Sequence, residues 1–114
     1  MTKSIHLSLD AMGGDNAPQI VVDGAAQSKI RYPDVKFSFF GNKNKLLPLV
    51  SSLKKLKNSE IIHTDETIDA NQKPSDAVRK GKNSSMGLAI QSVKIGQTDA
   101  IVSAGNTGAL MAMT

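Results

Sequence analysis

The sequence has 114 residues, of which 39% are hydrophobic and 21% charged, with no cysteine and a formal net charge of +4. This length suits one domain, and the composition excludes an intrinsically disordered chain and a membrane-spanning one. The missing cysteines exclude disulfides and thiolate metal ligands, and an aromatic content of 4% argues against a base-stacking nucleic-acid module.

The first strand and helix are predicted near the N-terminus. Alternating apolar residues predict a strand over 5–9, and a glycine-rich loop follows over 10–18. Pro18 suits the first turn of a helix, with Asn16 as its cap. This helix should end before Pro33, because a proline disfavours helical backbone at the residue before it.

A second strand and helix follow, and then a third strand. Residues 35–41 alternate in polarity and end in glycine, which predicts a strand. Leucines and a valine at helical spacing predict a helix over 46–56, in which Pro48 is compatible only with the first turn. The short apolar stretch at 60–64 predicts the third strand.

The rest of the chain predicts one polar connection, two helices and a strand. Residues 67–82 are loop-like, with one helical turn at 75–80. Residues 84–96 predict a helix with a serine cap and a glycine stop. A strand follows over 99–105, and the last helix opens at 106 or 107.

This alternation of strands and helices predicts an α/β fold with a mainly parallel sheet flanked by helices. No stretch is long and apolar enough for a signal peptide or a spanning helix, so we expect a cytoplasmic protein. The last apolar run stops without a cap or stop signal at Thr114. We therefore expect residues 1–114 to be the N-terminal part of a longer α/β domain, incomplete at its C-terminus.

The loop after the first strand, within "LDAMGGDNAP", is the first candidate site. Asp10 and Asp15 flank Gly13 and Gly14. Two carboxylates beside a glycine turn could hold a cation, orient a cationic group or act as a base. They could equally cap turns and the next helix.

The stretch "SAGNTG" is the second candidate site. Gly105 and Gly108 would let the backbone approach a ligand, Ser103 adds a hydroxyl, and the following helix begins with free N–H groups. This combination suits phosphate or a developing oxyanion, so we predict that Asn106 and Thr107 face the reacting groups. The alternative is a tight strand-to-helix turn with Thr107 as cap.

Basic residues gather in two places. Within "RKGKNSSM", Arg79 and Lys82 precede Ser85 at a helix start, which suits an anion site or a capped helix with surface charge. The helix predicted at 46–56 and its flanks form a basic cluster that is either a solvated face or a docking surface for an acidic partner, phosphate or nucleic acid. This cluster comprises Lys43, Lys45, Lys54, Lys55 and Lys57.

No catalytic or metal-binding spacing passes through His6 or His63, so both are predicted to be structural. The glycine-rich loops match neither the P-loop nor the dinucleotide-binding fingerprint.

Four stretches, "LDAMGGDNAP", "FFGN", "RKGKNSSM" and "DAIVSAGNTGALMA", occur in this order and cover the chain nearly end to end. Through them the chain resembles the N-terminal part of the bacterial phosphate acyltransferases of phospholipid synthesis, the PlsX family. The resemblance implies a fold related to isocitrate and isopropylmalate dehydrogenases. It also implies transfer of a fatty acyl group from acyl-acyl carrier protein to inorganic phosphate.

Further expectations follow from this resemblance. The acyl-phosphate would feed a membrane-bound glycerol-3-phosphate acyltransferase, and the protein would be a homodimer without a cofactor, a metal or a nucleic-acid partner. Family chains are much longer, and their membrane contact and later catalytic residues lie beyond this endpoint, so residues 1–114 alone should be inactive. Phosphate or substrate binding is expected from Asp10, Gly13, Gly14, Asp15, Arg79, Lys82, Ser85, Ser103, Gly105 and Gly108, and catalysis from Asn106 and Thr107.

Two other functions stay open on the residues alone. One is a nicotinamide-dependent, dehydrogenase-like domain, against which the missing dinucleotide fingerprint argues. The other is a non-catalytic module that binds an acidic carrier protein through the basic cluster.

Overall fold

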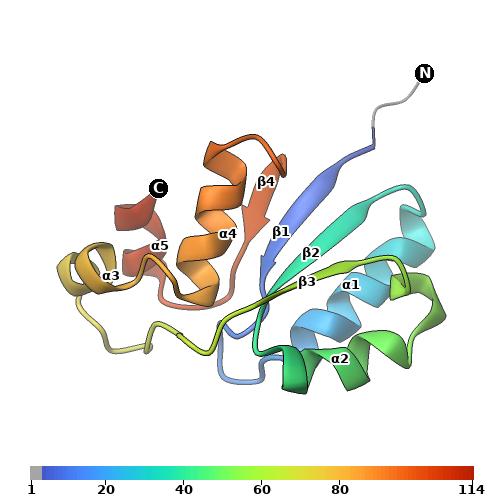
Figure 1. Cartoon of the computed structure of the whole chain (residues 1–114), viewed down its shortest axis with the longest axis horizontal. Coiled ribbons are helices and arrows are strands. Elements are labelled where there is room, and N and C mark those ends of the chain that lie inside the picture. The colour runs from blue at the N-terminus through green and yellow to red at the C-terminus, as the bar shows by residue number, and fades with distance from the viewer. Residues whose placement is uncertain (1–3) are drawn as a thin grey trace.

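The computed structural model of the chain describes residues 4–114, which form a four-stranded parallel sheet with helices on both faces (Figure 1). The strands are β1 (His6–Asp10), β2 (Lys36–Gly41), β3 (Glu60–His63) and β4 (Ala100–Val102). Their order across the sheet is β3-β2-β1-β4, and every pair is parallel. The prediction of an α/β fold with a mainly parallel sheet is confirmed.

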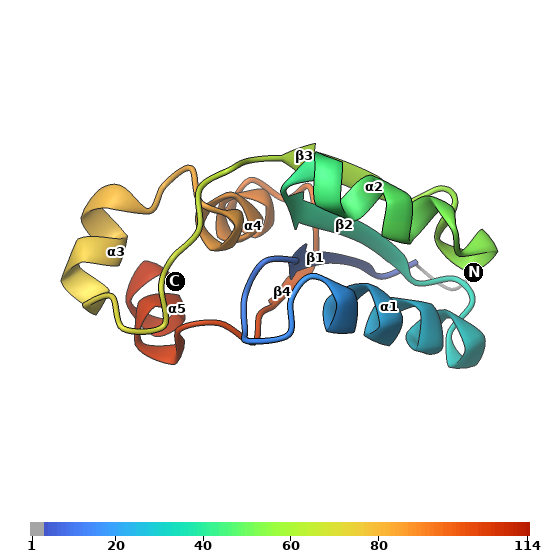
Figure 2. The ribbon, with the colours of Figure 1, turned by 90° about the horizontal axis from the view of Figure 1, so that it is seen from below.

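Within residues 4–114, three of the α-helices cover the two faces of the sheet, and the other two form a pair at its side. Helices α1 and α2 cover one face of the sheet, and α4 covers the other (Figure 2). Helices α3 and α5 pack on each other beside α4, away from α1 and α2. The bounds are α1 (Gln19–Arg31), α2 (Lys43–Ser51), α3 (Pro74–Lys80), α4 (Ser85–Lys94) and α5 (Thr107–Met113), with a 3-10 turn η1 (Lys54–Leu56).

The two faces of the sheet differ in polarity. Towards α1 and α2, the strands contribute Leu9, Phe37 and Phe39 to the main apolar core. Because side chains alternate along a strand, the residues between them face α4. Ser8 lies there, fully buried, and its hydroxyl is 2.5 Å from that of Thr98. The α4 face therefore carries buried polar groups that the opposite core lacks.

Helix α1 begins at Gln19, so Pro18 lies just before its first turn and not within it. Pro18 occupies the N-cap position and makes no side-chain capping bond. The prediction that Asn16 caps this helix is wrong, because Asn16 lies in the preceding turn, where its backbone carbonyl accepts from the Ile20 N–H at 3.2 Å. The predicted end before Pro33 is confirmed, since the helix stops at Arg31.

The helix predicted over 46–56 is divided between α2 and η1. Its start moves earlier because the Asn42 side chain accepts from the N–H groups of Asn44 and Lys45 and caps a helix that begins at Lys43. Pro48 consequently lies inside α2 and not in its first turn, and the helix ends three residues later at Ser51.

Two helix ends in the second half follow the expected chemistry. Ser84 caps α4 by accepting from the Gly87 N–H at 3.0 Å, and Gly96 takes a positive φ of 81° just after the helix ends. The cap of α5 is Asn106 and not Thr107. Among residues 4–114, none of the helices has the length and apolarity needed to cross a membrane.

Candidate functional site

The strand order places two loops side by side. The chain moves from β1 through β2 to β3 in one direction and then returns to add β4 on the other side of β1. Ligands of open parallel sheets bind at such a reversal, outside the carboxyl ends of the strands. Here the loop after β1 and the loop after β4 meet, since a Cβ at Gly13 would lie 3.0 Å from the Gly105 nitrogen. The two glycine-rich loops predicted as candidate sites therefore form one site.

Asp10, the last residue of β1, holds this site together. Its side chain is 2% exposed, and each carboxylate oxygen accepts from a different serine. Ser85, at the start of α4, donates to Oδ1 at 2.6 Å, and Ser103, just after β4, donates to Oδ2 at 2.7 Å. The Ser103 hydroxyl in turn accepts from the Gly105 N–H at 3.1 Å. One buried carboxylate thus joins β1, α4 and the loop after β4.

Glycine at position 13 is required by this carboxylate. A Cβ at Gly13 would lie 2.5 Å from Asp10 Oδ2, well inside van der Waals contact. Gly14 has a positive φ of 96°, a conformation that few other residues adopt. The glycines of the first loop therefore serve close packing and a tight turn.

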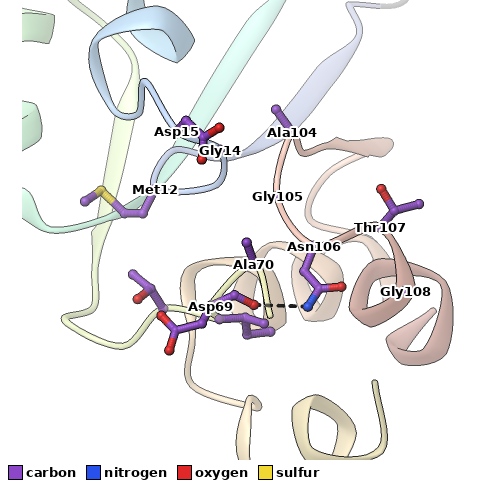
Figure 3. Close-up of a pocket in the computed structure, with 12 residues that line it drawn as sticks. Met12, Gly14, Asp15, Asp69, Ala70, Ala104, Gly105, Asn106, Thr107 and Gly108 are labelled. Atoms are coloured by element: carbon purple, nitrogen blue, oxygen red, sulfur yellow. Dashed lines mark hydrogen bonds between the residues drawn. The ribbon is translucent and has the colours of Figure 1, made fainter. Parts of the chain in front are cut away.

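A cavity of about 630 Å³ opens beside these loops (Figure 3). Three segments line it: the loop after β1, through Met12, Gly14 and Asp15; residues 67–70; and residues 104–108. Much of this wall is backbone, because glycines and alanines contribute nearly half of its lining residues. A backbone wall can approach a small polar ligand closely and offer N–H groups to it.

Six of the predicted site residues line this cavity, Gly14 and Asp15 from the first loop and four from the second, and others lie outside it. Gly105, Asn106, Thr107 and Gly108 all line it. Asp10, Gly13, Ser85 and Ser103 are absent from the lining, and their hydrogen bonds and packing support the wall from within the protein. Contact of these four residues with a substrate stays a prediction.

The Asn106 side chain is already occupied. Its Oδ1 accepts from the Ala109 N–H at 3.0 Å, and its Nδ2 donates to the backbone carbonyls of Asp69, at 3.0 Å, and Gln72, at 2.8 Å. Both amide hydrogens are therefore used within the protein. The N–H groups of Thr107 and Gly108, in the first turn of α5, have no acceptor within the helix because of their position.

The predicted cationic residues are elsewhere. Arg79, on α3, forms an ion pair with Asp76 three residues before it, and Lys82 lines a different cavity between α4 and the C-terminal end of α5. Among residues 4–114, the lining of the cavity beside the two loops contains the carboxylates of Asp15 and Asp69 but no lysine or arginine. A role for Arg79 and Lys82 in phosphate binding stays a prediction without support from proximity.

The N-terminus of α4 is closed by its neighbours. The Ser85 N–H donates to the Glu66 carbonyl at 3.0 Å, and the Gly87 N–H donates to the capping hydroxyl of Ser84. A Cβ at Gly87 would lie 2.1 Å from the Gly81 carbonyl oxygen, which shows how tightly the preceding loop covers this end. The helix start therefore offers little room for the anion expected there.

Both histidines make structural contacts, as predicted. His63, at the end of β3, accepts through Nδ1 from the Lys43 N–H at the start of α2. The His6 ring lies 2.7 Å from the Ser38 hydroxyl on the neighbouring strand.

Sequence reasoning missed the segment at 67–70 as part of the site. This polar stretch was predicted only as a connection, yet Thr67, Ile68, Asp69 and Ala70 form one wall of the cavity. No sequence motif marks this segment, because its position depends on a long-range bond. The Asn106 side chain donates to the Asp69 carbonyl, which lies 37 positions earlier in the chain.

Comparisons with known proteins identify the family. The family described as "Fatty acid synthesis protein" matches residues 5–114. A phosphate acyltransferase of Rhodopseudomonas palustris is 50% identical over 117 residues, which cover 99% of this chain and 33% of that protein. Phosphate acyltransferases of Parvibaculum lavamentivorans and Rhodospirillum rubrum are 49% and 47% identical, over 99% of this chain and 32% and 33% of theirs.

The chain thus spans about a third of the length of these curated relatives. Within that third, the match of the family model runs through every strand and helix of the described structure. The chain belongs to the fatty acid synthesis protein family.

Proposed function

We propose that residues 4–114 form one wall of the active site of a phosphate acyltransferase. The reaction moves a fatty acyl group from acyl-acyl carrier protein to inorganic phosphate and yields an acyl-phosphate and free carrier. The family match and the names of the relatives support this function. One observation links this function to particular residues. The cavity lies where the strand order reverses, and backbone and hydroxyl groups form its wall. A fold of the isocitrate dehydrogenase type is part of the same proposal.

The chemistry asks for positioning more than for a nucleophilic side chain. A phosphate oxygen attacks the thioester carbonyl carbon, the carbon–sulfur bond breaks, and the carrier thiolate leaves and takes up a proton. The protein must hold phosphate in line with the carbonyl and stabilise the oxyanion that forms. Thr107 lines the cavity with an exposed side chain, and the N–H groups of the first turn of α5 adjoin it. In this proposal Thr107 and these N–H groups contact the reacting oxygens.

The phosphate charge requires cations from outside the described lining. Asp15 and Asp69 repel an anion, and the cavity-lining residues among 4–114 include no lysine or arginine. The proposal therefore assigns the cationic contacts to another part of the intact protein or to a second subunit. A homodimer is part of the same proposal.

The basic cluster is proposed to dock the acidic carrier protein, and the structure divides it into two ends. Lys43 and Lys45 lie in the first turn of α2, directly after the carboxyl end of β2. Lys54 and Lys55 line a cavity together with the first residues of β1, β2 and β3. Only the first pair lies at the sheet edge that carries the candidate site, so this pair is the better placed for a carrier whose acyl group must enter the cavity.

The test is direct. The intact protein that contains this chain is incubated with acyl-acyl carrier protein and inorganic phosphate, and acyl-phosphate is trapped with hydroxylamine. Product that requires phosphate and carrier supports the proposal. Titration with a nicotinamide dinucleotide serves as the competing measurement. Dinucleotide binding without any acyl-phosphate would overturn the proposal in favour of a dehydrogenase-like domain.

A further inference from the structure

One wall of the cavity is a strap, residues 64–73, that runs from the end of β3 to the start of α3. Its middle part, 67–70, lines the cavity next to Asn106 of the loop after β4 and across from the loop after β1 (Figure 3). No helix or strand includes the strap, so its position depends on the bonds that hold it at each end and on Ile68, which packs against the apolar cluster of Ala77, Met86, Ile90 and Ala109.

The first end of the strap is tied to the start of α4. The Thr64 hydroxyl donates to the Asn83 carbonyl at 2.5 Å, and the Glu66 carbonyl accepts from the Ser85 N–H at 3.0 Å. A parallel bridge pairs Glu66 with Ser84. These contacts end before the residues that line the cavity.

The second end is tied by one side chain. Asn106 donates to the carbonyls of Asp69 and Gln72, which lie on either side of a tight turn closed by a bond from the Gln72 N–H to the Asp69 carbonyl at 3.1 Å. Figure 3 shows the Asn106 amide pointing at Asp69 across the cavity wall. The strap is therefore joined to the loop after β4 through this amide.

The cap of α5 fixes the direction of the same amide. Oδ1 of Asn106 accepts from the Ala109 N–H, which turns the NH₂ group away from the helix and towards the strap. Aspartate and serine cap helices about as well as asparagine, but neither can donate two hydrogen bonds from this position. Capping alone does not account for asparagine here.

We propose that Asn106 is a positioning residue that latches the strap across the cavity and so sets the shape of the phosphate and acyl pocket. The effect on catalysis rests on the proposed function, whereas the latch itself does not. In this role the side chain acts through the strap and does not touch the substrate. Its loss loosens the wall that includes Thr67 and Asp69 and weakens substrate binding.

Two variants separate the latch from the cap. Asn106→Asp and Asn106→Ser both keep an acceptor for the Ala109 N–H and lose the two N–H donors of the amide. The aspartate variant has no donor, whereas the serine variant adds no charge and keeps a single O–H, which cannot replace both bonds to the strap. A spin label attached at Asn71→Cys reports strap motion, because Asn71 is exposed and lies outside the cavity lining. A label at Gln27→Cys, exposed on α1, is the matched control.

In the intact protein, both variants should increase the mobility of the label at position 71 and leave that at position 27 unchanged. Losing two neutral hydrogen bonds should shift the equilibrium between the latched and the unlatched strap roughly tenfold or more towards the unlatched form. Because only the latched strap shapes the pocket, the KM for phosphate should rise about tenfold. The far-UV spectrum should stay as in the parent, because the cap of α5 is kept.

Each outcome decides a separate point. An unchanged label at position 71 in both variants would overturn the latch, whatever the activity. A mobile strap with an unchanged KM for phosphate would overturn its role in shaping the pocket. If the unsubstituted protein makes no acyl-phosphate, the proposed function fails, and the label still decides whether Asn106 holds the strap.

Discussion

Replacing Asp10 should weaken the fold more than any other single polar substitution on β1. Asp10→Ala removes the acceptor of two serine hydroxyls, those of Ser85 and Ser103, and both lie in or next to the protein interior. Ser103 also accepts from the Gly105 N–H, so the loop after β4 loses its link to the sheet. The perturbation therefore acts on three segments at once.

The expected magnitude follows from these bonds. A hydrogen bond to a charged group contributes about 1.5–3 kcal/mol, so two of them contribute roughly 3–6 kcal/mol. Removing a buried carboxylate also relieves its desolvation, which offsets part of that loss. We expect Asp10→Ala to reduce the free energy of unfolding by about 2–4 kcal/mol.

Ser8→Ala is the matched control. Ser8 lies on the same strand and the same face, is fully buried, and bonds one neutral hydroxyl, that of Thr98. Thr98 keeps a second partner in Ser92 at 3.1 Å. The control should lose only about 1 kcal/mol. Urea unfolding of the 114-residue chain, followed by far-UV circular dichroism, measures both variants against the parent.

A double-mutant cycle with Gly13→Ala sharpens the argument. The added Cβ would lie 2.5 Å from Asp10 Oδ2, so this substitution should destabilise the parent by about 1–3 kcal/mol through overpacking. In the Asp10→Ala background the carboxylate is gone and the loss should shrink by about 1 kcal/mol or more. Two results would refute this account of Asp10. One is an equal loss of unfolding free energy from Gly13→Ala in both backgrounds, and the other is an Asp10→Ala variant no less stable than Ser8→Ala.

Three further predictions concern activity and binding. Thr107→Ala in the intact protein should cut turnover about 10²-fold or more at near-normal melting temperature, and Thr107→Ser should restore most of it; a loss of stability alone would place the chemistry elsewhere. Charge reversal at Lys43 and Lys45 should weaken carrier binding more than reversal at Lys54 and Lys55, with a smaller difference at high salt; equal effects in a binding titration would contradict the division of the cluster. The 114-residue chain alone should neither bind phosphate measurably, as followed by ³¹P NMR, nor form acyl-phosphate; either result would show that cations from outside the described lining are not needed.

The elements of the fold were largely predictable because local pattern and final packing agree. Strand β2 alternates because Phe37 and Phe39 face the apolar core and Ser38 faces the other side. The serine cap and glycine stop of α4 mark its ends in the sequence as they do in the structure. Errors occurred where one side chain moved a boundary, as when Asn42 capped α2 early and left Pro48 in its interior.

The site was only partly predictable, because the type of a residue indicates which hydrogen bonds it can form but not which residue it bonds. The sequence placed Asp10 and Ser103 near the carboxyl ends of two strands, but it did not indicate the bond between them across 93 positions. Asn106 lines the cavity, and its contact with the reacting groups stays a prediction, but the sequence did not indicate that its amide bonds the strap. The order β3-β2-β1-β4, which brings the two loops together, depends on long-range pairing that no local pattern encodes.

The supporting contacts explain why glycines and small polar residues dominate this edge of the sheet. Side chains that hold the wall, such as Asp10 and Ser85, are buried and directed at each other, so the backbone of the loops is left facing the cavity. A wall of this kind keeps its shape when a ligand enters, because its hydrogen bonds lie within the protein and do not depend on the ligand. It supplies geometry but no positive charge. In the proposed transfer reaction, the described segment would present fixed N–H and hydroxyl groups to the oxyanion and another segment would neutralise phosphate, so neither would suffice alone.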